Sequence, residues 1–239
     1  MTDRLASLDR FYALMDDLDL HCAGKRTLAE CDGRMTWPNR GVYFFFEPGE
    51  TRASSSIPRV VRVGTHALRP SRSTLWGRLS QHRGSVGGRM PGGGNHRGSI
   101  FRLHVGTGLL ATGDWPASIR PTWGIGGSAT AEVRAAEYPL ERAVSDYIGA
   151  MPLLWIAIDD APGRTSDRGV IERGAIGLLS NAIQPAIDPP SAGWLGRHAD
   201  RESVRRSGLW NVNHVNDQFD RRFLQVLERH LAESPRPRC

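Results

Sequence analysis

A run of β-branched and aromatic residues, Gly41-Val42-Tyr43-Phe44-Phe45-Phe46, decides the fold of this chain. Residues of these types favour a β-strand. The next four residues, Glu47-Pro48-Gly49-Glu50, are typical of a turn, and residues 58–63 predict a second strand. Because the connection between the two strands is short, we expect them to pair in the antiparallel sense.

Helices and a third strand are expected outside this hairpin. Apolar residues recur at spacings of three and four in the segments that predict helices: residues 3–18, 75–82, 132–149, 168–181 and a last stretch from about residue 216. Ser71 or Ser73 is expected to cap the helix over residues 75–82. Residues 100–110 fit a strand or a short helix, and we favour the helix because their apolar positions do not alternate. The continuous apolar run over residues 153–158 predicts a central buried strand.

A glycine-rich segment follows the helix over residues 75–82. Seven of the 15 residues from Gly84 to Gly98 are glycine, which predicts a mobile loop that does not pack into a core. The segment also carries Arg89, Arg97 and His96, and Arg83 directly precedes it. Two interpretations remain open, a surface insertion or a flexible basic flap that lies on nucleic acid.

Length and composition predict one domain. With 239 residues and 39% hydrophobic content, the chain can bury a substantial core, and no internal repeat or long linker divides it. We expect a single decorated domain over residues 1–239. Its core, residues 41–184 with an insertion at 84–150, follows an N-terminal helical extension, residues 1–40. A C-terminal extension, residues 185–239, ends in an amphipathic helix.

The chain is basic, with 31 Lys and Arg against 25 Asp and Glu and a formal net charge of +6. Arginine greatly outnumbers lysine. Because arginine can grip a phosphate through two parallel hydrogen bonds, this composition suits a nucleic-acid partner. It also fits a protein from an arginine-rich, GC-rich genome, and charge alone does not separate the two explanations.

The cysteines and the apolar segments argue against a secreted or membrane protein. Cys22, Cys31 and Cys239 have neither the number nor the spacing of a disulfide scaffold or a zinc site. No apolar stretch reaches the roughly 20 residues that span a bilayer, and Met1-Thr2-Asp3-Arg4 does not begin a signal peptide. We therefore expect a cytoplasmic protein that has no membrane partner.

A second triplet, Arg62-Val63-Gly64, follows Gly41-Val42-Tyr43 by about twenty residues, and a helix with Arg78 and His82 one turn apart comes next. Together these motifs resemble the front half of a GIY-YIG nuclease domain. The resemblance covers residues 41–82 and 153–184. It implies an α/β (α+β) fold with a small three-stranded antiparallel sheet flanked by helices, and the predicted order of elements agrees with it.

The resemblance also implies site residues. In the family, the tyrosine of the first triplet lies in the active site, an arginine on the first helix contacts the scissile phosphate, and a later glutamate binds one divalent metal ion. The matching residues are Tyr43, Arg78 and Glu172, with Mg²⁺ or Mn²⁺ as the cofactor. We prefer Glu172 to its rival Glu141 because Glu172 follows the predicted buried strand, as in the family pattern. Asn181, or else Gln184, matches an asparagine that shapes the family's site.

These residue types suit phosphodiester hydrolysis, which must activate a water molecule and neutralise charge on the phosphoryl oxygens. A carboxylate such as Glu172 can hold a hard, octahedral Mg²⁺, and Arg78 would stabilise the phosphoryl charge. Tyr43 would accept the proton of the water, but a phenol with a pKa near 10 is a poor base without help. His82 lies one helical turn beyond Arg78 and could accept the phenol proton, as in some members of the family.

Arg62 stands where family members usually carry a second tyrosine. It either contributes a phosphate contact from that position or marks a loss of ordinary activity. The leading hypothesis is a metal-dependent DNA endonuclease, with RNA not excluded. The alternatives are a nucleic-acid-binding module that keeps the scaffold but does not cut, and an unrelated basic protein that binds other proteins.

Further polar and aromatic residues are candidates for nucleic-acid contacts. Arg97 and Arg102 lie in the donor-rich stretch over residues 95–104, and Arg83 directly precedes the glycine-rich segment. A polar surface whose hydrogen bonds are satisfied within the protein is the alternative for this stretch. Trp194 and Trp210, with the polar residues that include Asn211, Asn213 and His214, could stack on bases or read them. For the two tryptophans we favour a different role, as buried indoles that cap the core.

Overall fold

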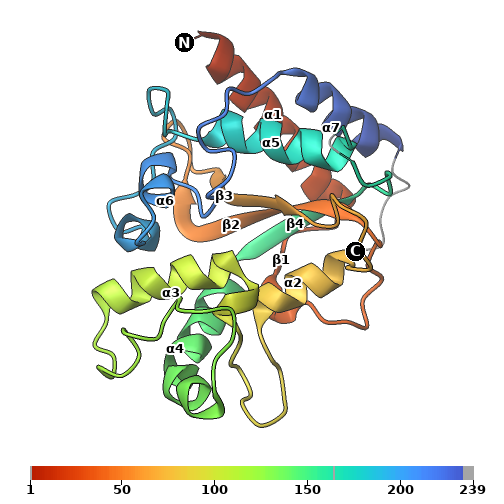
Figure 1. The fold of residues 1–239 in the computed structure, drawn as a ribbon. Coiled ribbons are helices and arrows are strands. Elements are labelled where there is room, and N and C mark those ends of the chain that lie inside the picture. Colours follow the sequence, from red (N-terminus) through yellow and green to blue (C-terminus); the bar gives the residue numbers. More distant parts are fainter. Residues whose placement is uncertain (1, 164, 234–239) are drawn as a thin grey trace.

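A four-stranded antiparallel sheet lies between two layers of helices in the computed structural model, which describes residues 2–163 and 165–233 (Figure 1). The strands are β1 (Arg26–Thr27), β2 (Gly41–Thr51), β3 (Pro58–Thr65) and β4 (Pro152–Ala157), in the order β1-β4-β2-β3. The α/β class is as expected, and the sheet has one strand more than the three expected. The extra strand, β1, is two residues long and pairs with the edge of β4.

The expected turn at Glu47-Pro48-Gly49-Glu50 is wrong, because β2 continues through it to Thr51. The pairing of β2 with β3 shifts register after Phe45 and again after Phe46, which marks a bulge. Gly49 adopts a left-handed φ of 84° inside this irregular stretch. The bulge therefore absorbs the turn-forming residues, and the chain reverses only over residues 52–57.

The helices cover the two faces of the sheet in separate sets (Figure 1). The first set contains α1 (Thr2–His21), α5 (Asp167–Leu179) and α7 (Arg222–Glu233), and the second contains α2 (Leu75–Arg83), α3 (Ile100–Thr112) and α4 (Ala131–Gly149). Because side chains of a strand alternate between faces, Val42 and Phe44 pack with the first set, whereas Tyr43 and Phe45 pack with the second. The helix interpretation of residues 100–110 is confirmed by α3.

Two helix starts differ from the expectation. Thr74, and neither Ser71 nor Ser73, caps α2, because its side chain accepts a hydrogen bond from the Gly77 amide at 3.0 Å. The last helix begins at Arg222 and not near residue 216. Its first amide is bonded to the Asp220 carboxylate at 3.0 Å, so this aspartate marks the start of the helix.

The C-terminal segment packs against the exposed edge of β3. It contains the short helices η3 (Leu195–His198) and α6 (Glu202–Ser207) and then follows the strand, where the Trp210 amide donates to the Val61 carbonyl at 2.8 Å. Trp194 and Trp210 are buried, and both indole N–H groups donate to the Glu47 carboxylate, at 3.0 and 2.8 Å. The preferred role of the two tryptophans as core residues is thus confirmed.

The glycine-rich segment is irregular, as expected, but its end packs against the protein. His96 is 2% exposed and begins a short helix, η2 (His96–Gly98). Earlier in the segment the amides of Ser85 and Gly92 close a small loop, with bonds of 2.7 Å to Gly93 and Ser85. The expectation that the segment packs into no core is therefore wrong for His96. A polar side chain that finds partners can be buried despite a loop-forming sequence.

The expectations about cysteines and about membrane-spanning segments can be checked only on the described residues. Cys22 and Cys31 are buried thiols in the cores on opposite faces of the sheet, and Cys239 lies outside the described residues. Among the helices of the described residues, none combines the length and the apolar character that crossing a bilayer requires.

Candidate active site

Tyr43 and His82 form a buried hydrogen-bonded pair between the sheet and α2. The Tyr43 hydroxyl lies 2.9 Å from His82 Nε2, and His82 Nδ1 lies 2.8 Å from the hydroxyl of Ser99. All three residues are buried. Burial lowers the pKa of His82 well below its usual value, and the charges of three nearby arginines lower it further. The ring of His82 is therefore neutral at physiological pH.

The hydrogen bonds indicate which nitrogen of His82 carries the proton. Ser99 caps α3, and its hydroxyl oxygen already accepts a bond from the Arg102 amide at 3.3 Å. If Nδ1–H donates to Ser99, then Nε2 accepts from Tyr43, and the buried phenol proton has an acceptor. We assign this tautomer to His82 because the opposite one leaves the phenol proton without an acceptor among the described residues. His82 is thus arranged to receive a proton from Tyr43.

Gly64 provides the space that the Tyr43 ring occupies. The two residues lie opposite each other in the β2–β3 pair. A Cβ atom on Gly64 would lie 2.3 Å from the Tyr43 hydroxyl oxygen and 2.4 Å from the ring carbon that bears it. The glycine of the second triplet is therefore required by contact with the tyrosine of the first, because no other residue leaves room for the phenol.

We expect Gly64→Ala to displace Tyr43 and to break its bond with His82. Overpacking of this kind costs about 1–3 kcal/mol of stability, so both the free energy of unfolding and any cleavage rate that depends on the pair should fall. Gly127→Ala is the matched control, because nothing lies within 4 Å of a Cβ at that position. Thermal unfolding and a nuclease assay on both variants would check this, and a Gly64 variant as stable and active as the control would contradict it.

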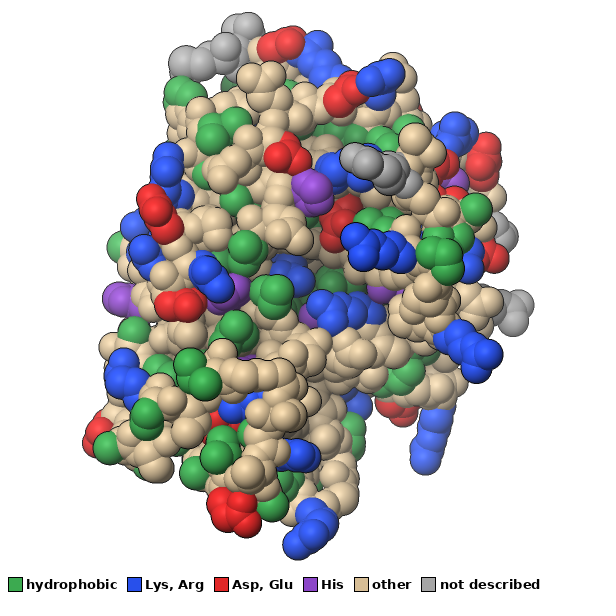
Figure 2. All heavy atoms as spheres, in the orientation of Figure 1, with side chains coloured by type: hydrophobic (Ala, Val, Ile, Leu, Met, Phe, Trp, Pro, Cys, Tyr) green, Lys and Arg blue, Asp and Glu red, His purple; other side chains and the backbone are tan. Residues whose placement is uncertain are grey.

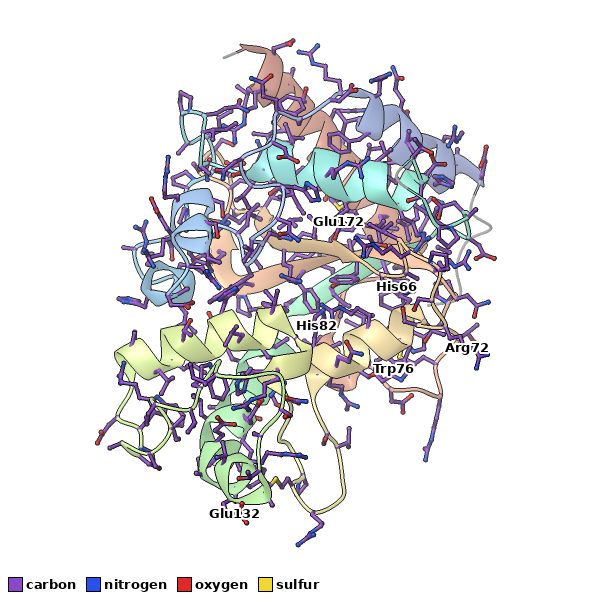
Figure 3. All side chains as sticks on the ribbon, viewed as in Figure 1. His66, Arg72, Trp76, His82, Glu132 and Glu172 are labelled. Atoms are coloured by element: carbon purple, nitrogen blue, oxygen red, sulfur yellow. The ribbon has the colours of Figure 1, made fainter. Side chains whose placement is uncertain are left out.

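Glu172 approaches the same end of β3 from the opposite face. It lies on α5, and its Oε1 accepts a hydrogen bond from the Thr65 amide at 3.2 Å. Figure 3 shows Glu172 between α5 and the sheet, and His82 between the sheet and α2. Because Thr65 follows Gly64 directly, the Tyr43 hydroxyl and the Glu172 carboxylate converge on neighbouring residues of β3.

Burial and nearby positive charges act in opposite directions on the pKa of the Glu172 carboxyl. Burial raises its pKa, and the Thr65 amide and the charges of His214, Arg62 and Arg173 oppose this rise. Oε2 has no hydrogen-bond partner among the residues that the structure describes. No group of three or more His, Cys, Asp or Glu side chains in those residues could hold a metal ion by itself. A metal here would have Glu172 as its carboxylate ligand and take water and substrate oxygens as the others, which is the usual behaviour of Mg²⁺.

Glu141, the rival to Glu172, is occupied by protein donors. Its Oε1 accepts bonds from the His96 amide at 2.7 Å and from His96 Nδ1 at 2.9 Å, and its Oε2 accepts one from Arg102 Nε at 3.0 Å. Burial raises the pKa of Glu141, but the bonds from His96 and the charge of Arg102 outweigh it, so the net pKa is lowered. Its oxygens are already satisfied, and this favours Glu172 as the metal ligand.

Arg78 projects from α2 on the side of the site that is open to solvent. One of its terminal nitrogens, Nη1, donates to the Gln81 side chain at 2.8 Å and to the Gly98 carbonyl at 3.2 Å. Its charge contributes to the lowered pKa values of His82 and Arg62, so it lies within electrostatic reach of both. The guanidinium keeps donors that no described residue accepts from, and these can bind a phosphate.

A family model described as GIY-YIG domain matches residues 2–236 of the chain. The chain belongs to the GIY-YIG family. The match includes both segments that were expected to be extensions of the core, residues 1–40 and 185–239, almost to their ends. Searches of curated proteins and of solved structures each found no match. Membership of the GIY-YIG family implies nuclease activity on nucleic acid, generally with a divalent metal ion.

Arg62, which replaces the second GIY-YIG tyrosine, is a buried residue that binds the C-terminal segment. Its Nη1 donates to the Trp210 carbonyl at 2.6 Å, and its guanidinium lies 4.6 Å from the centre of the Phe101 ring. Burial lowers the pKa of Arg62, and the nearby Tyr43 and Glu172 partly oppose this effect. Its Nε is buried without a hydrogen-bond partner among the described residues. Arg62 therefore uses part of its guanidinium as a structural anchor for the C-terminal segment.

Arg97 and Arg102 do not have the exposure that phosphate contacts need. Arg102 is fully buried, and it donates to Glu141 Oε2 and to the His82 carbonyl, at 3.0 and 2.9 Å. Arg97 forms two bonds with the Glu137 carboxylate, at 2.7 and 2.9 Å, and its side chain is 6% exposed. Carboxylates of α4 already pair with both guanidinium groups, so this geometry does not favour the nucleic-acid contacts of Arg97 and Arg102, which stay predictions.

The side chain of Asn181 bonds to the C-terminal segment, and its expected role in shaping the site stays a prediction. It follows α5, and its side-chain amide donates to the Asp188 carbonyl at 3.1 Å and to the Ser207 carbonyl at 3.4 Å. These bonds hold loops of the C-terminal segment. Arg83 donates from one nitrogen to the Ala29 carbonyl at 2.9 Å and is half-buried, so its expected contact with nucleic acid stays a prediction.

His66 is a residue near the site that the sequence did not single out. His66 lies two residues after Gly64, the end of the second triplet; it is 7% exposed, and its Nδ1 lies 3.3 Å from the Ser73 hydroxyl. Burial and the charges of Arg168, Arg40 and Arg78 lower the pKa of His66 to about 4, so the ring is neutral. In the sequence, the one signal for His66 is its position two residues after the second triplet.

Proposed function

We propose that this protein is a metal-dependent endonuclease that hydrolyses phosphodiester bonds in DNA. The observation that supports this most is the convergence of the Tyr43–His82 pair and the Glu172 carboxylate on Gly64 and Thr65. A general base and a metal ligand next to each other are what hydrolysis of a phosphodiester requires. Groups with strongly perturbed pKa values cluster at functional sites, and burial raises the pKa of Glu172.

Tyr43 is the proposed general base, and His82 is the proposed acceptor of the phenol proton. As water attacks the phosphorus, the phenol oxygen accepts the water proton and the phenol proton passes to His82 Nε2 over 2.9 Å. Burial is the main cause of the lowered pKa of His82, and it opposes this transfer together with the charges of the three arginines. A bound phosphate group carries the opposite charge and would offset them, so the transfer becomes more favourable when substrate is present.

Glu172 is the proposed ligand of a single Mg²⁺ or Mn²⁺ ion. When bound, such an ion neutralises charge on the phosphoryl group and on the leaving oxygen. The Thr65 amide fixes one carboxylate oxygen and leaves Oε2 for the cation. Arg78 would contact the phosphoryl oxygens from α2.

The surface around this site suits a polyanion. Figure 2 shows arginine or lysine side chains together with histidines in the recessed middle of the face between α5 and α2. The whole chain has a formal net charge of +6. Electrostatic attraction of this kind supports binding to DNA, and RNA would be attracted by the same charges.

We expect purified protein to convert supercoiled plasmid to nicked and linear forms with Mg²⁺ and to lose this activity when EDTA removes the metal. Mn²⁺ should restore cleavage after EDTA treatment, since it accepts the same oxygen ligands. Agarose gels taken over time measure the conversion. Cleavage that continues unchanged in EDTA would exclude the metal-dependent mechanism.

The alternative is a GIY-YIG module that binds nucleic acid without cutting it, and Arg62 in place of the second tyrosine is the observation that favours it. This alternative predicts binding that weakens steeply with salt and no metal-dependent cleavage. Fluorescence anisotropy with labelled duplexes and a plasmid assay on the same preparation separate the two functions.

A further inference from the structure

The segment from His96 to Ser99, which joins the glycine-rich segment to α3, contacts both candidate residues of α2. The Ser99 hydroxyl lies 2.8 Å from His82 Nδ1, and the Gly98 carbonyl accepts a bond from Arg78 at 3.2 Å. Ser99 is 1% exposed and His82 is fully buried, so water does not compete for the bond between them. The proposed proton acceptor and the proposed phosphate contact are thus held by one neighbouring segment.

The same carboxylate anchors both ends of this segment. At its start, the amide and Nδ1 of His96 lie 2.7 and 2.9 Å from Glu141 Oε1. Beyond its end, Arg102 Nε donates to Glu141 Oε2 at 3.0 Å. Removal of either partner would leave a buried charge unpaired, so this pair fixes the start of α3 against α4.

His82 is held from α3 at two points. Arg102 Nη1 donates to the His82 carbonyl at 2.9 Å and fixes its backbone, while Ser99 contacts its ring. The backbone contact leaves the ring nitrogens unaffected, because a carbonyl bond does not select which of them carries the proton. That selection depends on the Ser99 hydroxyl.

The bond to Ser99 decides whether His82 can act as an acceptor. A neutral imidazole carries one proton, so a ring protonated on Nδ1 accepts at Nε2, whereas a ring protonated on Nε2 cannot. Tyr43 lies on the Nε2 side. As the phenol proton reaches Nε2, positive charge develops on the ring, and an oxygen that accepts from Nδ1–H stabilises this charge.

We propose that Ser99 is a positioning residue of the nuclease, which keeps the proton of neutral His82 on Nδ1 so that Nε2 can accept the phenol proton of Tyr43. This inference rests on the proposed nuclease function. It also gives Glu141 a role other than metal binding, since its bonds to His96 and Arg102 hold the segment that carries Ser99. The expected insertion over residues 84–150 would therefore supply part of the active site.

Glycine and threonine at position 99 separate this role from the capping of α3. Ser99 caps that helix by accepting from the Arg102 amide at 3.3 Å. Glycine and threonine are about equally good at such a position. The extended backbone of Ser99, with φ −145° and ψ 102°, suits a β-branched side chain. Only threonine keeps a hydroxyl for His82, so the difference between the two variants isolates that hydrogen bond.

We expect Ser99→Gly to lower kcat for plasmid nicking with Mg²⁺ about 10- to 100-fold, the usual effect of losing one hydrogen bond to a group that becomes charged. KM should not change, because the bond does not involve substrate. Ser99→Thr should recover most of the wild-type kcat. The matched control is Thr130→Gly, which removes the hydroxyl that caps α4 through the Val133 amide and should leave kcat unchanged.

The protonation of the His82 ring gives a second readout that requires no cleavage. In protein labelled with nitrogen-15 at histidine, the chemical shifts of the two ring nitrogens show which of them carries the proton, and comparison with His82→Asn identifies the signals. We expect the proton on Nδ1 in wild type and in Ser99→Thr. In Ser99→Gly, where Nδ1–H has lost its acceptor, a larger share of rings should carry it on Nε2.

These measurements distinguish failure of this role from failure of the nuclease function. A wild-type kcat in Ser99→Gly, or equal losses in Ser99→Gly and Ser99→Thr, would overturn the role of Ser99 in a protein that still cuts DNA. A wild-type ring protonated on Nε2 would overturn it as well. A wild-type protein that cuts no plasmid with Mg²⁺ or Mn²⁺ would remove the nuclease function itself, and this role with it.

Discussion

Replacing Arg78 by alanine is expected to slow DNA cleavage by about 10²- to 10³-fold, the usual cost of losing one preorganised donor to a developing negative charge. The Arg78 guanidinium reaches the site from α2 and keeps donors that the Gln81 and Gly98 contacts leave open. Those two contacts are exposed to solvent, so their loss should change the free energy of unfolding little. The expected defect is therefore in the rate and not in the fold.

Arg222→Ala is the matched control for Arg78, since it removes the same charge from a side chain that is 82% exposed and pairs with Asp220 two residues away. Initial rates of plasmid nicking, measured with Mg²⁺ at equal protein concentrations, compare the two variants. Thermal unfolding of both confirms that they are folded. If the two variants lost activity equally, Arg78 would act only through the overall charge of the protein.

Replacing Glu172 by glutamine is expected to reduce cleavage by about 10³-fold or more, because the neutral amide cannot hold the divalent ion that neutralises the phosphoryl group. Glutamine keeps the size of the side chain and an oxygen that can accept the Thr65 amide. The substitution therefore removes the charge and leaves the packing of α5 unchanged.

Stability measurements give an independent test of Glu172. Burial raises the pKa of this carboxyl in the folded protein. The protonated carboxyl therefore contributes to stability at low pH, and this contribution is lost as the pH rises through the raised pKa. At neutral pH the ionised group therefore opposes folding of the metal-free protein, and Glu172→Gln should melt no lower than wild type. Mg²⁺ should raise the melting temperature of wild type only. Equal stabilisation of both proteins by Mg²⁺ would place the ion elsewhere.

The replacement of the second motif tyrosine is explained in part by the geometry of Arg62. Its guanidinium binds the Trp210 carbonyl and so fixes the segment that continues to His214. A tyrosine has a single O–H donor, whereas the planar guanidinium of Arg62 presents several N–H donors in different directions. In this chain the position therefore helps to hold the C-terminal segment on the β3 edge, within the same site.

Much of the fold could be predicted because local patterns encode it. The alternation in residues 41–46 decides which side chains face each layer, and the spacing of Arg78 and His82 places both on one side of α2. The bulge after Phe45 could not be predicted, since Pro48 and Gly49 favour a turn locally and only pairing with β3 keeps them in a strand. Competition between local preference and strand pairing decided that segment.

The sequence by itself determined the order of the motif residues Tyr43, Arg78 and Glu172 and the kinds of element that carry them. Only the tertiary structure decided which charged side chains remain available to bind a phosphate or a metal ion. Arg102 and Glu141 are 39 residues apart and satisfy each other, which disfavours one as a phosphate contact and the other as a metal ligand. The Asn211 side chain bonds to the backbone of Val63 because the C-terminal segment follows the β3 edge. Partners so distant in the chain depend on which helix faces and strand edges meet, and no local pattern of residues encodes that.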